Sequence, residues 1–99
     1  MGLLGAFVSF GTAYAQSVAA GHSIAEHWCS SCHLVDLRQR KAPNDAIPSF
    51  VAVAQMKSTT RLSLAAFLST SHEPMPNFVL SRQEIADVSA YILSLRKPR

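Results

Sequence analysis

The sequence predicts an all-α protein of about four short helices with irregular connections, and three observations carry this prediction. Apolar residues recur at spacings of three and four in separate segments, which is the period of a helix with one buried face. Residues that suit helix N-termini precede several of these segments. No strand is evident from a sustained alternation of apolar and polar residues.

The first predicted helix begins at Val18. Its apolar stripe has spacings of three, four and three, and it consists of Val18, Gly21, Ala25 and Trp28. A glycine inside an exposed helix costs about 1 kcal/mol relative to alanine. We therefore expect Gly21 to lie where another helix approaches closely.

Two further helices are possible in the middle of the chain. Residues 49–56, SFVAVAQM, follow Pro48 and fit either a short helix or a strand by pattern alone. Thr60 is a suitable N-cap for a helix that runs to about Ser69. The apolar face of that helix consists of Leu64, Phe67 and Leu68.

The last helix has the clearest boundaries. Ser81 and Glu84 are spaced for a capping box, in which each side chain binds the other residue's backbone N–H. The charge of Lys97 and the following Pro98 suit the end of this helix. The apolar residues between these ends again have spacings of three, four and three, and they are Ile85, Val88, Ile92 and Leu95.

Residues 1–15, MGLLGAFVSFGTAYA, are expected to be a secretory signal that is cleaved after Ala15. They carry no charge, and their apolar run is shorter than the roughly 20 residues that span a bilayer, so no permanent membrane helix is expected. No basic residue precedes the run, which makes the signal atypical or places its start further upstream. The alternative is a buried N-terminal helix. Cleavage would leave residues 16–99 as one domain in the periplasm.

The charge of the chain excludes one class of partner and suggests another. The formal net charge is +3, but no basic helix is interleaved with aromatic residues, so nucleic-acid binding is not expected. Small basic clusters are typical of a solvated surface, and they also suit encounter with an acidic protein. The two clusters are Arg38, Arg40 and Lys41, and Arg96, Lys97 and Arg99.

Reactive side chains are concentrated in HWCSSCH, residues 27–33. Cys29 and Cys32 are the only cysteines of the chain, and His33 follows them directly. Export would favour a disulfide between two such cysteines. A bridge across two residues, however, removes little entropy from the unfolded chain. The pair is therefore expected to serve another purpose.

Three chemistries use a Cys-x-x-Cys pair. Zinc needs two more ligands, and the remaining histidines lack a second paired spacing. A thiol–disulfide exchange site belongs at a helix start after a strand, and no strand is evident here. Covalent haem attachment uses both thiols of Cys-x-x-Cys-His and the histidine as an iron ligand. Cys29 and Cys32 on one helical turn would share a side, as two vinyl groups of one ring require, so haem attachment is favoured.

A haem that binds no substrate needs a second axial ligand. Met75 lies between Pro74 and Pro76, which restrict the segment and leave little entropy to lose on ligation. His72 and Met56 are the alternative candidates for this ligand. The simpler interpretation of His72 is a histidine on the surface, and that of Met56 is a residue packed in the core.

Together these residues resemble a small bacterial class I cytochrome c. The resemblance is carried by Cys29-Ser30-Ser31-Cys32-His33, by Met75-Pro76 and by the flanking helices, and it covers roughly residues 18–96. It implies the class I cytochrome c fold, with helices wrapped around one covalently attached haem c. It also implies that the first and last helices cross at Gly21 and Tyr91.

The resemblance further implies an acceptor for the ring N–H of the ligand histidine. In the family, a proline carbonyl in a Gly-Pro-aromatic element accepts this hydrogen bond. Residues 47–50, Ile-Pro-Ser-Phe, resemble that element except for Ile47. Pro48 is the first candidate and Pro43 the second.

Three other residues have two interpretations each. We expect Trp28 to fill space between helices rather than to conduct electrons. Ser49 and Asn77 suit hydrogen bonds to the methionine sulfur or a haem propionate, and equally suit bonds to their own backbone.

Iron held by His33 and Met75 has both axial positions filled, which is typical of electron transfer without substrate turnover. The expected protein is not an enzyme. It carries one electron between periplasmic or membrane redox partners, as a monomer or as a subunit of a larger complex. The alternatives are a haem sensor or peroxidase-like enzyme with a labile Met75, and a dedicated subunit of a dehydrogenase or oxidase.

Overall fold

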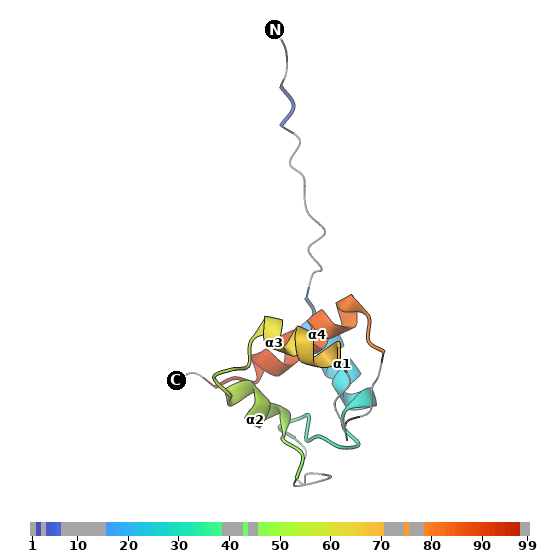
Figure 1. Ribbon diagram of the computed structural model, residues 1–99. Coiled ribbons are helices and arrows are strands. Elements are labelled where there is room, and N and C mark those ends of the chain that lie inside the picture. The colour runs from blue at the N-terminus through green and yellow to red at the C-terminus, as the bar shows by residue number, and fades with distance from the viewer. Residues whose placement is uncertain are drawn as a thin grey trace.

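A computed structural model describes residues 2, 4–6, 16–38, 43, 46–70, 75 and 79–97. Within these ranges the chain forms helices and no β-strand, so the all-α prediction is confirmed, and the ambiguous segment 49–56 is largely helical. The helices are α1 (Val18–Trp28), α2 (Phe50–Gln55), α3 (Arg61–Leu68) and α4 (Arg82–Ser94) (Figure 1).

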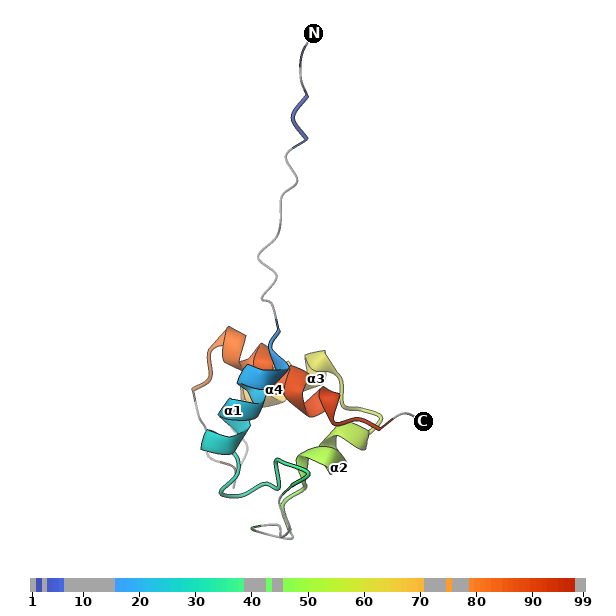
Figure 2. The same ribbon diagram turned by 180° about the vertical axis from the view of Figure 1, so that it is seen from behind.

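Helices α1 and α4 cross each other, and Gly21 lies at the crossing (Figures 1 and 2). A Cβ atom added to Gly21 would overlap the backbone oxygen of Asp87 and lie 2.9 Å from the Cβ of Tyr91. Because any side chain would meet the α4 backbone, only glycine permits this approach. The predicted crossing of the first and last helices at Gly21 and Tyr91 is confirmed.

The side chain of Tyr91 extends this crossing into the core. Its hydroxyl donates a hydrogen bond to the backbone oxygen of Val35, which is itself buried. The centroid of its ring lies 4.8 Å from that of His22 on α1 and 6.4 Å from that of Phe50 on α2. One residue of α4 therefore lies beside α1, the loop that follows it and the start of α2.

Side chains cap the N-termini of the later helices as the sequence predicts. Thr60 and Ser63 form a capping box at α3, and Ser81 and Glu84 form one at α4. Ser49 caps α2, so its hydroxyl accepts from the backbone of its own helix, which is the simpler of its two expected roles. Each such cap stabilises its helix by about 1 kcal/mol.

The end of α4 differs from the prediction. The helix ends at Ser94, before Lys97, and the chain turns so that the guanidinium of Arg96 reaches α2. Arg96 donates from Nε to the carbonyl of Ala54 at 2.9 Å and from Nη2 to that of Thr59 at 2.7 Å. Carbonyls in the last turn of a helix lack donors within it. Arg96 supplies such a donor and links α4 to α2.

The core lies between α4 and the other three helices, each of which contacts α4, and the outer ends of the α1 stripe are not part of it. Val18 and Trp28 are 46% and 50% exposed, because they lie beyond the crossing at the two ends of α1. Met56 is also not the core residue that was expected, since it is 52% exposed where α2 ends. The buried apolar residues are Ala25, Val35, Phe50, Ala54, Leu64, Val88, Tyr91 and Ile92.

Several expectations concern residues outside the described ranges. They are most of the signal segment 1–15, the basic residues Arg40, Lys41 and Arg99, the prolines Pro74, Pro76 and Pro98, and the site candidates His72 and Asn77. Among the helices of the described residues, none combines the length and apolar character that a membrane crossing requires.

We expect Gly21→Ala to lower the free energy of unfolding by about 1–3 kcal/mol, because the added methyl group overlaps the α4 backbone. The loss is the net change, after the gain of about 1 kcal/mol that alanine brings to a helix. The control is Ala19→Val at an exposed position of α1, where the change should stay near 0.5 kcal/mol, about the usual limit for surface sites. Denaturant unfolding measures both, and an undiminished stability of Gly21→Ala would contradict the close approach.

Arg96→Ala is expected to lower the free energy of unfolding by about 1–3 kcal/mol, since the carbonyls of Ala54 and Thr59 lose their donor. Lys97→Ala, at the next and also exposed position, is the matched control. Thermal unfolding followed by circular dichroism compares the two variants. Equal midpoints would mean that water replaces the guanidinium at no cost.

Candidate functional site

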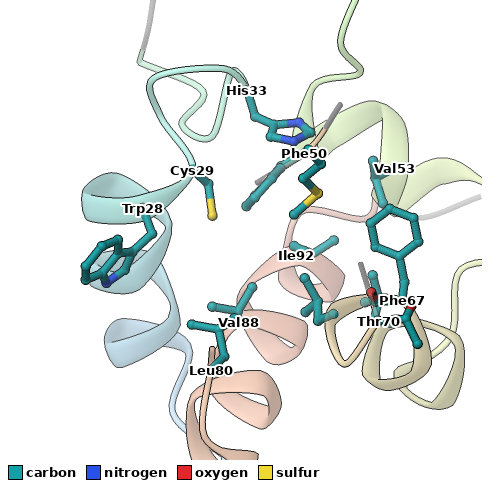
Figure 3. Close-up of a pocket in the computed structure, with 13 residues that line it drawn as sticks. Trp28, Cys29, His33, Phe50, Val53, Phe67, Thr70, Leu80, Val88 and Ile92 are labelled. Atoms are coloured by element: carbon teal, nitrogen blue, oxygen red, sulfur yellow. Dashed lines mark hydrogen bonds between the residues drawn. The ribbon is translucent and has the colours of Figure 1, made fainter. Parts of the chain in front are cut away.

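One cavity is lined by side chains from all four helices. The empty space in and in front of it is about 750 Å³, open solvent included. Figure 3 shows the Cys29 sulfur and the His33 imidazole directed into this space. The lining residues are predominantly apolar and are Trp28, Cys29, His33, Phe50, Val53, Leu64, Phe67, Leu68, Thr70, Met75, Leu80, Val88 and Ile92.

The Cys-x-x-Cys-His segment forms turns that continue α1. The backbone N–H of Cys29 donates to Ala25 at 2.9 Å, and those of Cys32 and His33 both donate to the carbonyl of Cys29, at 3.1 and 2.8 Å. This helix-like winding directs Cys29 and His33 to the cavity. Cys32 is not a lining residue, and its sulfur accepts a weak hydrogen bond from Ser31 at 3.9 Å.

The two thiols do not form a disulfide, and Cys29 is not activated for exchange. Burial and, to a lesser degree, the charge of Cys32 raise the pKa of the Cys29 thiol to about 11. Thiols that exchange rapidly have lowered pKa values and sit in electropositive surroundings. The apolar environment of Cys29 therefore argues against thiol–disulfide exchange at this motif.

The imidazole of His33 is held by the carbonyl of Pro48. The Nδ1 atom lies 2.7 Å from the Pro48 oxygen. A carbonyl only accepts, so Nδ1 carries the hydrogen and the neutral ring has its lone pair on Nε2. Between the two proline candidates, the bond is made to Pro48 and not to Pro43. It leaves the Nε2 of His33 available to a metal ion.

A second hydrogen bond joins the same two segments. The backbone N–H of Phe50 donates to the carbonyl of Leu34 at 2.9 Å. Together with the bond from His33 to Pro48, it holds residues 33–34 against 48–50. The ring of Phe50 also lies beside that of His33, with centroids 5.3 Å apart. The start of α2 therefore positions the histidine.

Met75 lines the same cavity and is half-buried. It belongs to the segment before α4, whereas His33 follows α1, so two distant parts of the chain bring a thioether and an imidazole to one space. Met56 is exposed where α2 ends and does not line the cavity. His72, the remaining candidate, lies outside the described residues.

The cavity fits the haem that the resemblance implies. Its walls are predominantly apolar, and the heteroatoms of its lining residues include a thiol, an imidazole and a thioether, which are groups that hold c-type haem. Trp28 and Phe67 line the cavity while 50% and 42% exposed, so large apolar side chains remain partly open to water. A flat apolar ring would cover such a surface.

Sequence reasoning did not identify most of the cavity wall. Val53, Leu80 and Val88 line it, and their apolar character gives no signal that separates a wall residue from a core residue. The bond from Tyr91 to the carbonyl of Val35 also has no local signal. Trp28, which was expected between helices, instead lies half exposed at the cavity.

Comparisons with known proteins agree with this site. Residues 18–96 match the family model described as cytochrome c. The chain is also 43% identical over 88 residues to cytochrome c-552 of Bradyrhizobium diazoefficiens, a match that covers 89% of this chain and 84% of that protein. No solved structure matches the chain with comparable significance. The chain therefore belongs to the cytochrome c family, whose members carry covalently attached haem c, and haem c is its cofactor.

Proposed function

We propose that this chain is an exported monohaem electron carrier, which accepts one electron from a redox protein in the periplasm or membrane and passes it to another. Electron transfer through haem follows from membership of the cytochrome c family. Our proposal adds that Cys29 and Cys32 form the thioether bonds, and that His33 and Met75 are the axial ligands. The observation that carries it is that Cys29, His33 and Met75 line one apolar cavity.

The surroundings of His33 support its role as a ligand. The carbonyl of Pro48 accepts the Nδ1 hydrogen, which fixes the ring orientation and raises the basicity of Nε2. The bond from Phe50 to Leu34 restrains the backbone on either side of this contact. A ligand that is held in this way needs little rearrangement when the charge of its metal changes.

The ligand set also supports a carrier rather than an enzyme. When bound, the haem supplies a one-electron ferric–ferrous couple, and methionine–histidine ligation raises its reduction potential. With Met75 on the iron, neither axial position is open to oxygen or peroxide. The predominantly apolar lining of the cavity offers water few hydrogen-bonding partners beside these ligands. A labile Met75 would instead favour a sensor or peroxidase-like enzyme.

Met75→Ala tests the axial assignment. We expect reduced wild-type holoprotein to bind little carbon monoxide, and Met75→Ala to bind it stoichiometrically, because the substitution opens one axial position. Absorption spectra in the presence of the gas measure this. The reduction potential of the variant should also fall, since methionine ligation raises it.

Met56→Ala is the matched control, because Met56 is exposed and does not line the cavity. It should behave as the wild type does. Carbon monoxide binding of equal strength in the wild type and in Met75→Ala would contradict Met75 as a stable ligand. Strong binding by the wild type would favour the sensor or enzyme alternative.

The partner surface is proposed to surround the mouth of the cavity. Trp28 and Phe67 are half exposed there, and apolar contacts of this kind are common at protein interfaces. Arg38 is exposed in the loop that follows His33, and the basic cluster continues in sequence with Arg40 and Lys41. We propose that this cluster, here called the basic rim, attracts acidic partners, whether the chain diffuses freely or serves as a subunit of a dehydrogenase or oxidase.

Stopped-flow oxidation by ferricyanide, a small anionic oxidant, tests the basic rim. The rate should fall as salt is raised, because the Debye length shrinks from about 10 Å at 0.1 M to about 3 Å at 1 M. Arg38→Gln should slow the reaction at low salt, and Lys57→Gln, an exposed lysine between α2 and α3, should not. A cationic cobalt(III) oxidant should show the opposite salt dependence. A salt-independent rate with both oxidants would contradict the proposal.

A further inference from the structure

Three potential metal ligands converge on the side of α1 that faces the loop after His33. The Nε2 atom of His22 lies 2.7 Å from Oδ2 of Asp36 and 3.0 Å from Oε1 of Glu26. All three ligand atoms lie within 4.8 Å of one another. None of these residues lines the cavity described above, so the group, here called the His22 cluster, is separate from the haem ligands.

The fold holds the cluster in place before any ligand binds. His22 and Glu26 are four residues apart on α1, so their side chains lie on the same helical face. The ring of His22 lies beside that of Tyr91, with centroids 4.8 Å apart. The other oxygen of Asp36, Oδ1, accepts the backbone N–H of Arg38 at 3.0 Å, which leaves Oδ2 directed to His22.

Hydrogen bonds hold the carboxylate of Asp36 in the cluster. The hydrogen bond from the Arg38 backbone and, next, the one from His22 lower the pKa of the Asp36 carboxyl. His22 Nε2 lies 2.7 Å from the Oδ2 of this carboxylate and donates to it. A cation bound to Nε2 would take its lone pair, and the neutral ring would then carry its hydrogen on Nδ1.

We propose that the His22 cluster binds one divalent transition-metal ion of the Zn²⁺ type, through His22 Nε2, Glu26 Oε1 and Asp36 Oδ2. One imidazole and two carboxylates form a three-ligand set that zinc accepts, with the fourth position left to water. Mg²⁺ prefers oxygen ligands and would be a poor occupant.

The surroundings give such an ion access and set a limit on its affinity. A surface hollow adjoins the cluster, so a fourth, water-borne ligand has room to enter, and it is lined by Glu26, Ser30, Val35, Asp36 and Arg38. The positive charge of Arg38 acts on Asp36 and opposes a cation. The two carboxylates outweigh that charge. A bound ion would join α1 to the loop after His33.

Isothermal titration of purified holoprotein with ZnCl₂, after treatment with a chelator, tests the site. We expect one ion per protein. His22→Ala should weaken binding by at least about tenfold, the lower end of what the loss of metal-site groups costs. Zn²⁺ should also raise the thermal unfolding midpoint of the wild type and not of this variant, because a ligand that binds only the folded state stabilises it.

Two further variants separate ligation from packing. His22→Ala also removes the ring beside Tyr91, so Asp36→Asn, which keeps the side-chain shape, should weaken Zn²⁺ binding as well. His27→Ala is the control, since His27 is exposed on the same helix and its Nδ1 bonds to the carbonyl of Ser23 instead. It should bind as the wild type does.

Several results would overturn this site. They are an absence of Zn²⁺ binding by the wild type, undiminished binding by both His22→Ala and Asp36→Asn, and an equal loss in His27→Ala. Mg²⁺ that competes with Zn²⁺ at equal concentration would overturn the assignment to a transition metal. Haem spectra of each variant report separately on the axial ligands, so failure here leaves the electron-carrier proposal unaffected.

Discussion

The close approach of α1 to α4 at Gly21 is the constraint on which the other contacts depend. Because Gly21 has no Cβ, the Tyr91 side chain reaches past α1, and its hydroxyl bonds to Val35, two residues after His33. Helix α1 ends next to Cys29. The crossing therefore holds the Cys-x-x-Cys-His segment from both sides: α1 precedes it, and the loop bound to Tyr91 follows it. A change of one methyl group at Gly21 would displace all of these elements together.

The position of His33 depends on helix α2, which is itself stabilised by contacts at both of its ends. Helix α2 is too short to be stable alone, because isolated helices below about 12 residues are marginal in water. Ser49 caps its first turn, and Arg96 from beyond α4 binds the carbonyls near its end. Stabilised at both ends, α2 holds Pro48 where its carbonyl can accept from His33. The orientation and tautomer of His33 therefore depend in part on Arg96, a residue beyond the last helix.

The cofactor explains why so small a core suffices. Few large side chains are buried in the part of the chain that the structure describes, and those at the cavity, such as Trp28 and Phe67, remain half exposed. Haem c, the cofactor of this family, adds apolar surface that a chain of this length does not supply itself. The raised pKa of Cys29 reflects the same apolar surroundings, in which a neutral sulfur is preferred to a thiolate.

Local chemistry made part of this protein predictable from sequence alone. The capping box of Ser81 and Glu84 and the Cys-x-x-Cys-His motif depend only on residues three or four apart, and Gly21 on an apolar stripe already predicted a helix crossing. Only the tertiary structure decided that α4 ends early so that Arg96 reaches α2, and that Asp36 meets His22. The contact of Arg96 with α2 joins residues that are far apart in sequence, and the contact of Asp36 with His22 joins residues separated by an irregular loop. Their geometry follows from how the helices pack, which no local pattern records.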